Sequence, residues 1–506
     1  MTTSTTQPVP SDTTNLARGA VVSFAGAATS AVMGFVLTVV LARSLGDAGS
    51  GVVLQAVAVF AIVLSLARAG MDSAAVWILP RLVAHDPARI RGTLVIMLVA
   101  ALSSGALLGA ATIALAPMFA LTGDAHAREV ARAVSVAGWF IPAGALLLVG
   151  LAATRGLGGM VPYIGVGSIG LPLVRPLAVW LVAATGGSFA AVTLAWAAPL
   201  PVALIAAAIV LRSQVRRHEN VAGGRGSWRP DRGLRRSVVA YALPRTLSAG
   251  LEQSVLWLDV ILVGILAGSA SAGVYGGASR FVAAGLVIDT AIRIVVATRF
   301  STLLFEEKFA ELEALYRTAT TWLVLFGTPI YLLLAAFAPV VLGLLGPGFD
   351  EGSAALVILC VGGILTFTTG NIQSVLLMSG RSGWAAFNKA VVLAVNVGGN
   401  FLLVPLIGLN GAAVSWALSM LIDAALATVE VRHFIGIRVD ARMVAYALLV
   451  PVVTVGIPAF AVRLTAGPTL AGLLIAIPVC TALFLGWCAL DRARLHLHDL
   501  SLIARK

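Results

Sequence analysis

The sequence predicts an all-α protein that crosses a membrane many times. About fourteen apolar stretches, each roughly 20 to 30 residues long, run between Gly19 and Leu490, and a bilayer core about 30 Å thick needs about 20 helical residues per crossing. The 506-residue chain is 59% hydrophobic and only 11% charged, unlike a water-soluble domain. Because lipid offers no hydrogen-bond partners to backbone amides, each stretch is expected to form a helix.

The order of these stretches predicts two lobes of six helices each, followed by two extra C-terminal helices. The predicted organisation is a disordered polar tail at 1–18, an N-lobe at 19–211, a basic linker at 212–236, a C-lobe at 237–433, a helical pair at 434–490 and a tail at 491–506. The predicted spans are 19–42, 51–79, 93–117, 130–153, 161–184, 189–211, 237–267, 273–299, 318–345, 352–378, 386–406, 411–431, 443–463 and 470–490.

A faint internal repeat supports the division into two lobes. The segment Asp47-Ala48-Gly49 follows the first span, and Ser271-Ala272-Gly273 follows the seventh, 224 residues later. Arg68 comes 19 residues after the first of these glycines, and Arg293 comes 20 residues after the second. Both helices run in the same direction, so the repeat is predicted to be parallel, as in transporters built from two related halves.

Lys and Arg residues fall mostly on one side of the predicted helices. With the N-terminus placed in the cytoplasm, 25 of the 34 lie in cytoplasmic connections or tails and four lie outside. This bias follows the positive-inside rule and predicts an even number of spans with both termini in the cytoplasm. Topology therefore accounts for the net charge of +12, and nucleic acid is not expected as a partner. The basic linker is interpreted as a topology determinant, with contact to anionic headgroups as the alternative.

Nine charged residues inside the predicted spans are the main candidates for function. An arginine at the bilayer centre costs about 2.5–3.5 kcal/mol on insertion scales, so these side chains are expected to face a watery cavity or one another. The arginines are Arg68, Arg175, Arg245, Arg280 and Arg293, and the carboxylates are Asp72, Glu252, Asp259 and Asp289.

Helical spacing groups several of these charges. Arg245, Glu252 and Asp259 are seven residues apart and form one polar stripe on the seventh span. A tight turn to the antiparallel eighth span places Asp259 level with Arg280, which predicts an outer Asp–Arg pair. The same relation places Arg245 level with Arg293, in an inner cluster of arginines.

Two interpretations of these charges stay open at this point. The i,i+4 pairs Arg68–Asp72 and Asp289–Arg293 are typical of structural ion pairs between packed helices. The functional hypothesis is a cationic cavity between the lobes, because guanidinium groups bind phosphate or pyrophosphate through paired donors. In that hypothesis the carboxylates Asp72, Glu252, Asp259 and Asp289 are candidates for binding a coupling ion or proton.

An apolar stripe lies between the eighth and ninth spans. Phe305, Phe309, Leu312 and Tyr316 share one helical face, while charged residues face away. This pattern is typical of an amphipathic helix on the membrane surface, and an extension of the ninth span is the alternative.

Catalytic motifs do not emerge from the sequence. It contains no P-loop, no His-Glu-x-x-His and no nucleophile elbow, and Cys360, Cys480 and Cys488 lie within spans, where they are expected to be buried apolar residues. No metal, cofactor or catalytic residue is therefore predicted, and a transporter is favoured over an enzyme.

Short motifs in both halves carry a resemblance to a known family. The first span ends Leu41-Ala42-Arg43-Ser44-Leu45-Gly46, and the eighth begins Ala272-Gly273-Val274-Tyr275-Gly276. These segments resemble the A-R-x-L-G and G-x-Y-x-x-A motifs of polysaccharide-biosynthesis flippases of the MOP superfamily.

The resemblance implies two six-helix lobes around a V-shaped cavity lined by helices one, two, seven and eight. It implies a flippase that moves a lipid-pyrophosphate-linked oligosaccharide across the cytoplasmic membrane by alternating access, for cell-surface polysaccharide synthesis. The two extra helices fit members in which such a pair helps form a groove for lipid tails. Implied partners are the lipid-linked oligosaccharide, membrane lipids, and a polysaccharide polymerase with its glycosyltransferases.

Other members of the superfamily fit this sequence less well. Lipid II flippases carry arginines within helix one, whereas the first span here has charges only at its ends, Arg18 and Arg43. Multidrug (MATE) transporters usually have twelve helices, many with an acidic residue in helix one. A lipid II flippase, a multidrug/cation antiporter and a membrane glycosyltransferase are kept as alternatives.

Overall fold

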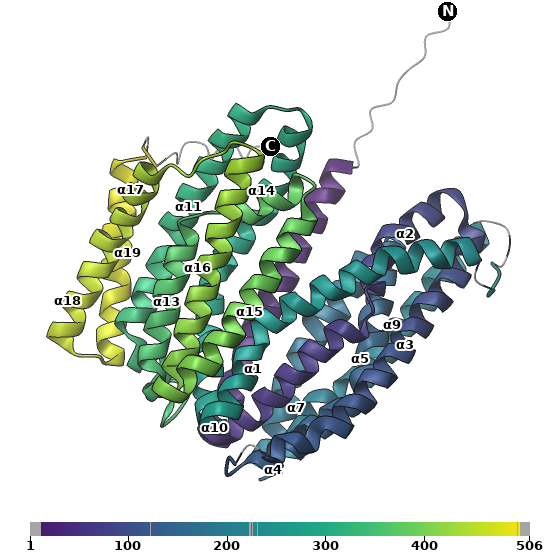
Figure 1. Ribbon diagram of the computed structural model, residues 1–506, viewed down its shortest axis with the longest axis horizontal. Helices are drawn as coiled ribbons and strands as arrows, with labels where there is room; N and C mark the ends of the chain where they lie inside the picture. The colour runs from purple at the N-terminus through teal and green to yellow at the C-terminus, as the bar shows by residue number, and fades with distance from the viewer. Residues whose placement is uncertain are drawn as a thin grey trace, which may run out of the picture. The chain divides into compact units, whose positions relative to one another are not determined.

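All regular elements in the described part of the chain are helices (Figure 1). The computed structural model describes residues 12–121, 123–221, 224, 226–229, 231–492 and 494–495, with the side chains of 12–24, 284, 294, 295 and 298 left out. Most of the two predicted tails therefore lies outside the described residues, as does the side chain of Arg18.

The bounds of the elements follow the apolar stretches of the sequence. The helices are α1 (Asp12–Ala67), α2 (Met71–His85), α3 (Ile90–Leu115), α4 (Ala127–Trp139), α5 (Ile141–Gly156), α6 (Met160–Pro162), α7 (Leu171–Ala184), α8 (Phe189–Ala197), α9 (Pro199–Val221), α10 (Arg232–Phe305), α11 (Phe309–Ala336), α12 (Ala338–Gly343), α13 (Ser353–Phe367), α14 (Ile372–Met378), α15 (Ser382–Ile407), α16 (Leu409–Phe434), α17 (Ala441–Pro451), α18 (Ile457–Ala466) and α19 (Leu470–Leu490). Short 3-10 turns or π-helical segments lie at η1 (Pro87–Arg89), η2 (Ala116–Leu121), η3 (Tyr163–Gly170), η4 (Phe349–Gly352) and η5 (Val452–Gly456).

The predicted number of spans is not confirmed. Within the described residues, 11 helices are long and apolar enough to cross a membrane, or 12 if α4 and α5, bent by 44°, form one span. The chain is a multi-pass membrane protein, but the predicted count of fourteen is not confirmed. One reason is that α1 contains the predicted spans 19–42 and much of 51–79, and α10 contains both 237–267 and 273–299.

A single glycine joins the two parts of each merged helix. Gly46 in α1 has φ 71° and ψ −173°, and Gly268 in α10 has φ 88° and ψ 165°. This backbone region is open almost only to glycine, since a Cβ would clash there. The chain therefore changes direction at one residue and needs no connecting loop.

The two repeated turns after these glycines pack directly against each other. A Cβ on Gly51 would lie 1.8 Å from the carbonyl oxygen of Ser269, and a Cβ on Gly273 would lie 2.0 Å from that of Asp47. The Nε2 of Gln55 donates to Ser269 Oγ at 3.3 Å, and Ser269 Oγ in turn bonds to Asp124 at 2.5 Å. The weak sequence repeat thus coincides with a real backbone contact.

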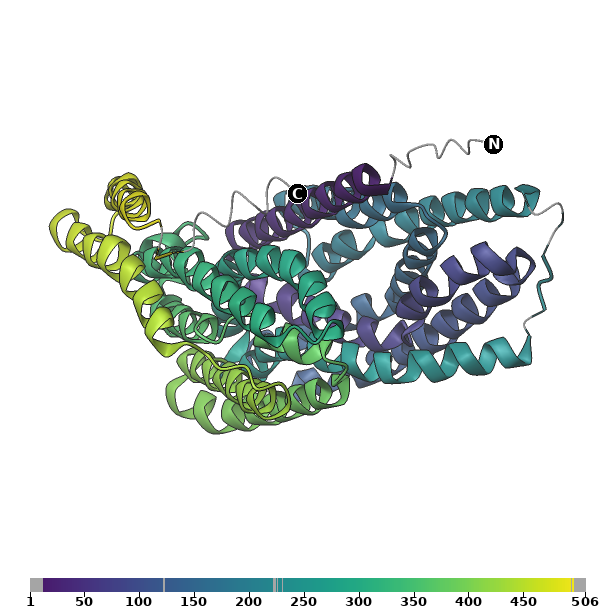
Figure 2. The same ribbon diagram turned by 90° about the horizontal axis from the view of Figure 1, so that it is seen from above.

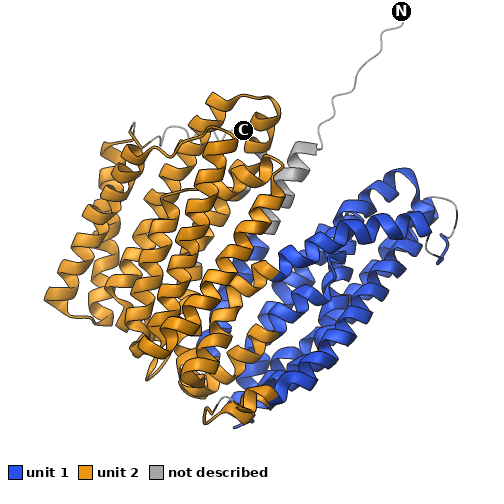
Figure 3. Ribbon diagram, in the orientation of Figure 1, with its two compact units in different colours: residues 1–40, 60–117, 132–250 blue, residues 41–59, 118–131, 251–506 orange. Residues whose placement is uncertain are grey.

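The chain divides into two compact units, which Figure 3 shows in blue and orange. Unit 1 comprises the residues up to Val40, Phe60–Pro117 and Arg132–Gly250, and unit 2 comprises Leu41–Val59, Met118–Ala131 and the residues from Leu251 on. Residues 41–59 and 118–131, which lie within the predicted N-lobe, are grouped with unit 2. The predicted boundaries otherwise stay predictions.

In unit 1 the helix α5 is central. It packs against α2, α3 and α9, and its Ile141, Leu147 and Val149 are fully buried. Part of the predicted basic linker is held in place by hydrogen bonds. Buried Glu219 accepts one from Arg91 at 2.6 Å and one from the backbone N–H of Gly226 at 3.2 Å.

In unit 2 the helix α16 packs against both α13 and α15, and α15 and α16 lie side by side in both ribbon views (Figures 1 and 2). Near one end of these helices a buried cluster joins Phe300 of α10 to Leu312 and Tyr316 of α11 and to Ile372 of α14. Of the predicted apolar stripe, Leu312 and Tyr316 of α11 are thus part of the protein core, in agreement with the alternative of a helix extension. Phe305, at the end of α10, and Phe309, at the start of α11, are exposed.

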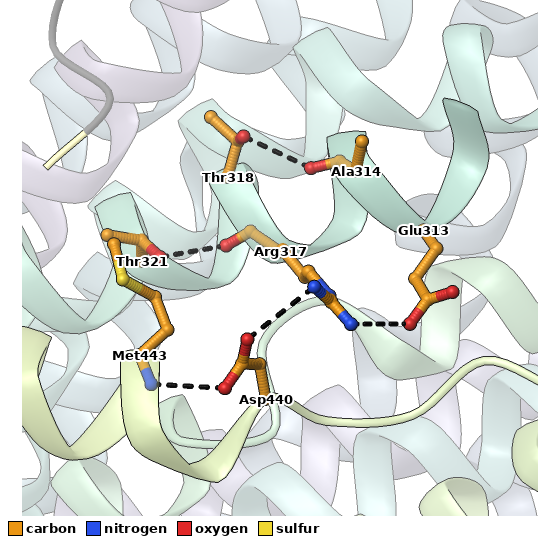
Figure 4. Close-up of polar contacts among 7 residues, drawn as sticks. All are labelled: Glu313, Ala314, Arg317, Thr318, Thr321, Asp440 and Met443. Carbon is orange, nitrogen blue, oxygen red and sulfur yellow. Dashed lines mark hydrogen bonds and ion pairs between the residues drawn. The ribbon is translucent and has the colours of Figure 1, made fainter. Parts of the chain in front are cut away.

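The first of the two predicted C-terminal spans, formed by α17 and α18, is attached to α11 at two points. Asp440 caps α17 by accepting from Met443 N–H at 3.2 Å, and its carboxylate lies 3.6 Å from Arg317, which also pairs with Glu313 at 2.9 Å (Figure 4). At the other end, Arg463 donates to the carbonyl of Ala336 at 2.9 Å. The pair is therefore part of unit 2.

We expect Gly51→Ala to destabilise the protein by about 1–3 kcal/mol or more, because a methyl group would be forced into backbone that cannot move aside cheaply. Gly34→Ala is the control, since it lies in the same helix and a Cβ there meets nothing within 4 Å. Thermal unfolding in detergent should show a lower midpoint for the first variant and an unchanged or slightly higher one for the second. Equal midpoints would contradict the close packing of the two turns.

Candidate functional site

Asp259 occupies a buried polar site in unit 2. It is 4% exposed, and it accepts hydrogen bonds from Tyr275 Oη at 3.1 Å and from Asn400 Nδ2 at 2.8 Å. Sixteen residues of straight helix would separate Asp259 and Tyr275 by about 24 Å, so the contact requires the reversal of α10 at Gly268. The change of chain direction at Gly268 is therefore required to form this site.

A cavity of about 140 Å³ opens beside this carboxylate. At about 30 Å³ for each water, it has room for a few water molecules or a partly hydrated ion. Among its lining residues are Trp257, Asp259, Tyr275, Ser279, Arg280 and Trp416. It combines one anionic, one cationic and several aromatic side chains.

The predicted outer Asp259–Arg280 pair does not form. Both residues line the same cavity, as their predicted levels require, but within the described residues no ion pair joins them. The guanidinium of Arg280 lies 4.1 Å from the centroid of the Trp257 ring, and Asp259 uses neutral donors. Arg280 therefore contacts the face of the Trp257 ring, where the sequence predicted a contact with the Asp259 carboxylate.

In unit 1, Arg68 forms the predicted ion pair with Asp72 at 2.7 Å. The two side chains are about one-fifth exposed and lie across the short break between α1 and α2. Gly70 lies at that break, with φ 64°, and a Cβ on it would be 2.2 Å from the carbonyl of Ala242 in α10. The pair therefore sits where α1, α2 and the first part of α10 meet.

Arg175 and Arg245 contact aromatic rings instead of carboxylates. Arg175 donates to the Trp196 carbonyl at 3.2 Å and lies 4.2 Å from the centroid of its ring. Arg245 is exposed, 5.9 Å from the ring of Tyr241, which stacks on Trp77 at 4.5 Å.

The other candidates lie in the part of α10 that belongs to unit 2. Glu252 and Arg293 are exposed, and Asp289 is half-buried, one turn before Arg293. The structure thus brings Arg68 to Asp72, and Asp259 to the cavity of Arg280. The proposed roles of all nine residues in binding substrate or ion stay predictions, as does the cationic cavity between the lobes.

Sequence reasoning missed a group of buried polar residues on α15 and α16. Asn388 Nδ2 donates to Glu430 at 2.8 Å, and Lys389 pairs with Asp423 at 2.6 Å. Lys389 falls within the predicted span 386–406. Asp423 and Glu430 both fall within the predicted span 411–431, and this was the signal that could have revealed them.

Comparison with known proteins places these features in a family. The family model described as "Polysaccharide biosynthesis protein" matches residues 16–304. A curated relative, the probable low-salt glycan biosynthesis flippase Agl15 of Haloferax volcanii, is 24% identical over 209 residues. That match covers 40% of this chain and 43% of the relative, so the chain spans less than half of the relative's length.

Solved structures share the fold. The lipid II flippase MurJ in an inward closed conformation matches with a TM-score of 0.69 and 13% identity, over 93% of this chain and 98% of that one. An inward-facing MATE transporter of the MOP superfamily matches with a TM-score of 0.63 and 16% identity, over 80% and 94%. A MOP superfamily transporter from Pyrococcus furiosus matches with a TM-score of 0.54 and 16% identity, over 83% and 95%.

The names of these relatives and structures are those of flippases and transporters, and none is that of an enzyme. Their identities are low, so the structural matches bear on the fold. The family model covers more than half of the sequence and includes both repeated glycine turns. The chain therefore belongs to the polysaccharide biosynthesis protein family and has the fold of the MOP superfamily transporters.

Proposed function

We propose that this protein is a flippase that moves a lipid-pyrophosphate-linked oligosaccharide across the cytoplasmic membrane for cell-surface polysaccharide synthesis. The observation that carries the proposal is the family match over residues 16–304, supported by a curated relative named as a glycan biosynthesis flippase. The proposed mechanism is alternating access through a cationic cavity, with both termini in the cytoplasm. A polysaccharide polymerase and glycosyltransferases are the proposed partners.

Arg245 and Arg293 are the strongest candidates for binding the pyrophosphate. Both are exposed, and Arg293 interacts electrostatically with Asp289, one turn before it on the same helix, whereas no described salt bridge includes Arg245. An arginine without an acidic partner keeps its donors for a ligand, and guanidinium binds phosphate oxygens in pairs. Arg175 and Arg280 rest on tryptophan rings, so their charge is also not neutralised.

Arg68 fits a structural role better than the other four arginines. Its guanidinium is held by Asp72 at 2.7 Å, at a junction of three helix segments. Such a pair stabilises helix packing, and its charge contributes little to attracting an anionic substrate. Asp72 is for the same reason a weaker candidate for ion coupling.

Asp259 is the best candidate for ion coupling. Its described hydrogen-bond partners, Tyr275 and Asn400, are neutral, and a buried carboxylate without a positive partner is costly. Binding a proton or a small cation removes that cost, so occupancy of the site would alter the stability of one conformation over another. Glu252 is exposed and Asp289 half-buried, so desolvation acts less on them.

The same site favours one alternative, a cation-coupled antiporter of the same superfamily. MATE transporters are among the structural matches, and Asp259 with its cavity would serve such an exchanger equally well. The two functions differ in cargo, so export of a glycan and resistance to drugs on overexpression distinguish them.

Arg245→Ala is expected to lower glycan export about tenfold or more, because a hydrogen bond to a charged group contributes about 1.5–3 kcal/mol. Arg245→Lys should retain part of the activity. The measurement is surface glycan in cells that lack the wild-type protein, with the amount of inserted protein determined in parallel. Arg81→Ala is the matched control, since Arg81 lies 4.6 Å from the Trp77 ring of the same aromatic pair. Equal loss in both variants would indicate a packing role only.

Arg68→Ala should destabilise the protein by about 1–3 kcal/mol, because Asp72 is left without its charged partner. The double variant Arg68→Ala/Asp72→Ala should recover most of this loss in a thermal unfolding experiment, and export should follow stability. If the double variant is fully stable but does not export glycan, a role of Arg68 in substrate binding would be supported instead.

Asp259→Asn should uncouple transport from an imposed gradient of Na⁺ or protons, because asparagine keeps the shape of the site but not its charge. Translocation by purified protein in vesicles, with and without each gradient, measures this coupling. Glu311→Gln removes an exposed carboxylate of α11 and serves as the control. Unchanged gradient dependence in Asp259→Asn would exclude this residue from coupling.

A further inference from the structure

One face of α9 changes from apolar to basic along the helix. Its members follow one another at intervals of three or four residues, which places them on the same side of the helix: Pro199, Val202, Ala206, Ile209, Ser213 and Arg216. Arg212 and Arg217 flank its basic end. We call these eight residues the α9 face. Its apolar half belongs to the predicted sixth span, and its basic half begins in the predicted cytoplasmic linker.

The apolar half of the α9 face lines a groove of about 640 Å³. Its other lining residues come mostly from α7 and η3, among them Gly165, Val174 and Leu181, and all of them are apolar. The volume falls within the range of about 300–1,000 Å³ that is typical of small-molecule sites. Both helices belong to unit 1 (Figure 3), and among the described spans the one that contains α7 is the least covered by other helices. The groove therefore suits a hydrocarbon chain that enters from the lipid.

The basic half of the α9 face lines a shallow depression next along the helix, to which Arg212, Arg216 and Arg217 contribute. All three arginines are exposed, and no described salt bridge includes any of them. Glu219 is the only carboxylate of α9, and it is buried and engaged by Arg91. The three guanidinium groups therefore keep their donors for an anion, and paired N–H donors of this kind suit phosphate oxygens.

The spacing of the two halves matches the dimensions of a membrane lipid. Ala203, which lines the groove, precedes Arg212 by nine residues, a rise of about 14 Å along the helix. One leaflet of a bilayer core about 30 Å thick is about 15 Å deep. A lipid with an acyl chain in the groove would therefore place its headgroup beside the arginines. A single amphipathic molecule thus accounts for both the groove and the basic depression.

We propose that the α9 face binds a membrane phospholipid with an anionic headgroup, with one acyl chain in the groove between α7 and α9 and the phosphate at Arg212, Arg216 and Arg217. Charge complementarity favours an anionic lipid over a zwitterionic one, and basic pockets between membrane helices on the cytoplasmic side commonly bind anionic headgroups. The proposal does not depend on the cargo of the proposed function, whose phosphates are assigned to Arg245 and Arg293 of α10.

The test uses the purified full-length protein in a neutral detergent, and phosphatidylglycerol is titrated while thermal unfolding is followed. The unfolding midpoint should rise in a saturable manner, because a ligand that binds only the folded state stabilises it. The rise should weaken as salt is added. Phosphatidylcholine with the same chains is the control for the headgroup, and glycerol 3-phosphate is the control for the acyl chain. An equal rise with either control would overturn the proposal.

Arg212→Gln/Arg216→Gln tests the basic half of the site. It should weaken the binding of phosphatidylglycerol about tenfold or more, because each arginine near an anionic headgroup contributes favourably. Arg235→Gln/Arg236→Gln is the matched control, since it removes two exposed arginines of unit 1 that do not line the depression. Equal weakening in the two double variants would indicate attraction to the overall charge of the protein and would overturn the proposal.

Ala206→Phe tests the apolar half by filling the groove with a side chain. It should weaken the binding of phosphatidylglycerol several-fold, whereas Ala208→Phe, at an exposed position of the same helix outside the groove, should leave it unchanged. The unfolding midpoint without lipid shows whether each variant is folded. If Ala206→Phe is not, Ala178→Phe fills the groove from α7. Unchanged binding in a folded groove variant would overturn the proposal.

A polyprenyl phosphate, titrated in the same way, distinguishes a membrane phospholipid from a cargo lipid. If it binds and loses affinity in the arginine and groove variants while phosphatidylglycerol does not bind, the groove belongs to the cargo and the proposal is overturned. If phosphatidylglycerol binds as expected while the wild type exports no glycan, the lipid site stands and the proposed function fails.

Discussion

The structure of unit 2 depends on one backbone-to-backbone contact, between the turn at 47–51 and the turn at 269–273. Gly51 and Gly273 permit an approach that any side chain would prevent, and each follows a glycine at which a helix reverses. This contact brings residues 41–59 into unit 2, and the reversal at Gly268 places Tyr275 against Asp259. Four glycines thus position a polar site that contains none of them.

The intramembrane charges are stabilised in two distinct ways. Arg68 and Lys389 are neutralised by carboxylates, whereas Arg175, Arg245 and Arg280 lie over aromatic rings. An aromatic ring attracts a guanidinium without cancelling its charge, and it leaves the edge of the group and its N–H donors accessible. A protein that must bind an anion reversibly within a membrane benefits from the second arrangement. A protein that needs rigid packing benefits from the first.

The sequence predicted what depends on local pattern. Hydropathy located the helices, the spacing of four residues predicted the Arg68–Asp72 pair, and the repeated glycine segments marked turns that do meet. It did not predict the partners of Asp259, because Asn400 is 141 residues away and hydropathy gives depth without identifying the facing helix. Amphipathicity at 305–316 could not distinguish a lipid surface from a protein core. The predicted count of spans stays unconfirmed where one glycine, in place of a loop, joins two helical parts in α1 and in α10.

The attachment of the C-terminal helices to α11 has a mechanical consequence. Asp440, at the start of α17, pairs with Arg317 of the 28-residue helix α11, and Arg463 of α18 donates to the Ala336 carbonyl at the C-terminal end of the same helix. Two contacts at separate points along α11 oppose rotation of α17 and α18 relative to that helix. We therefore expect α17 and α18 to move together with α11.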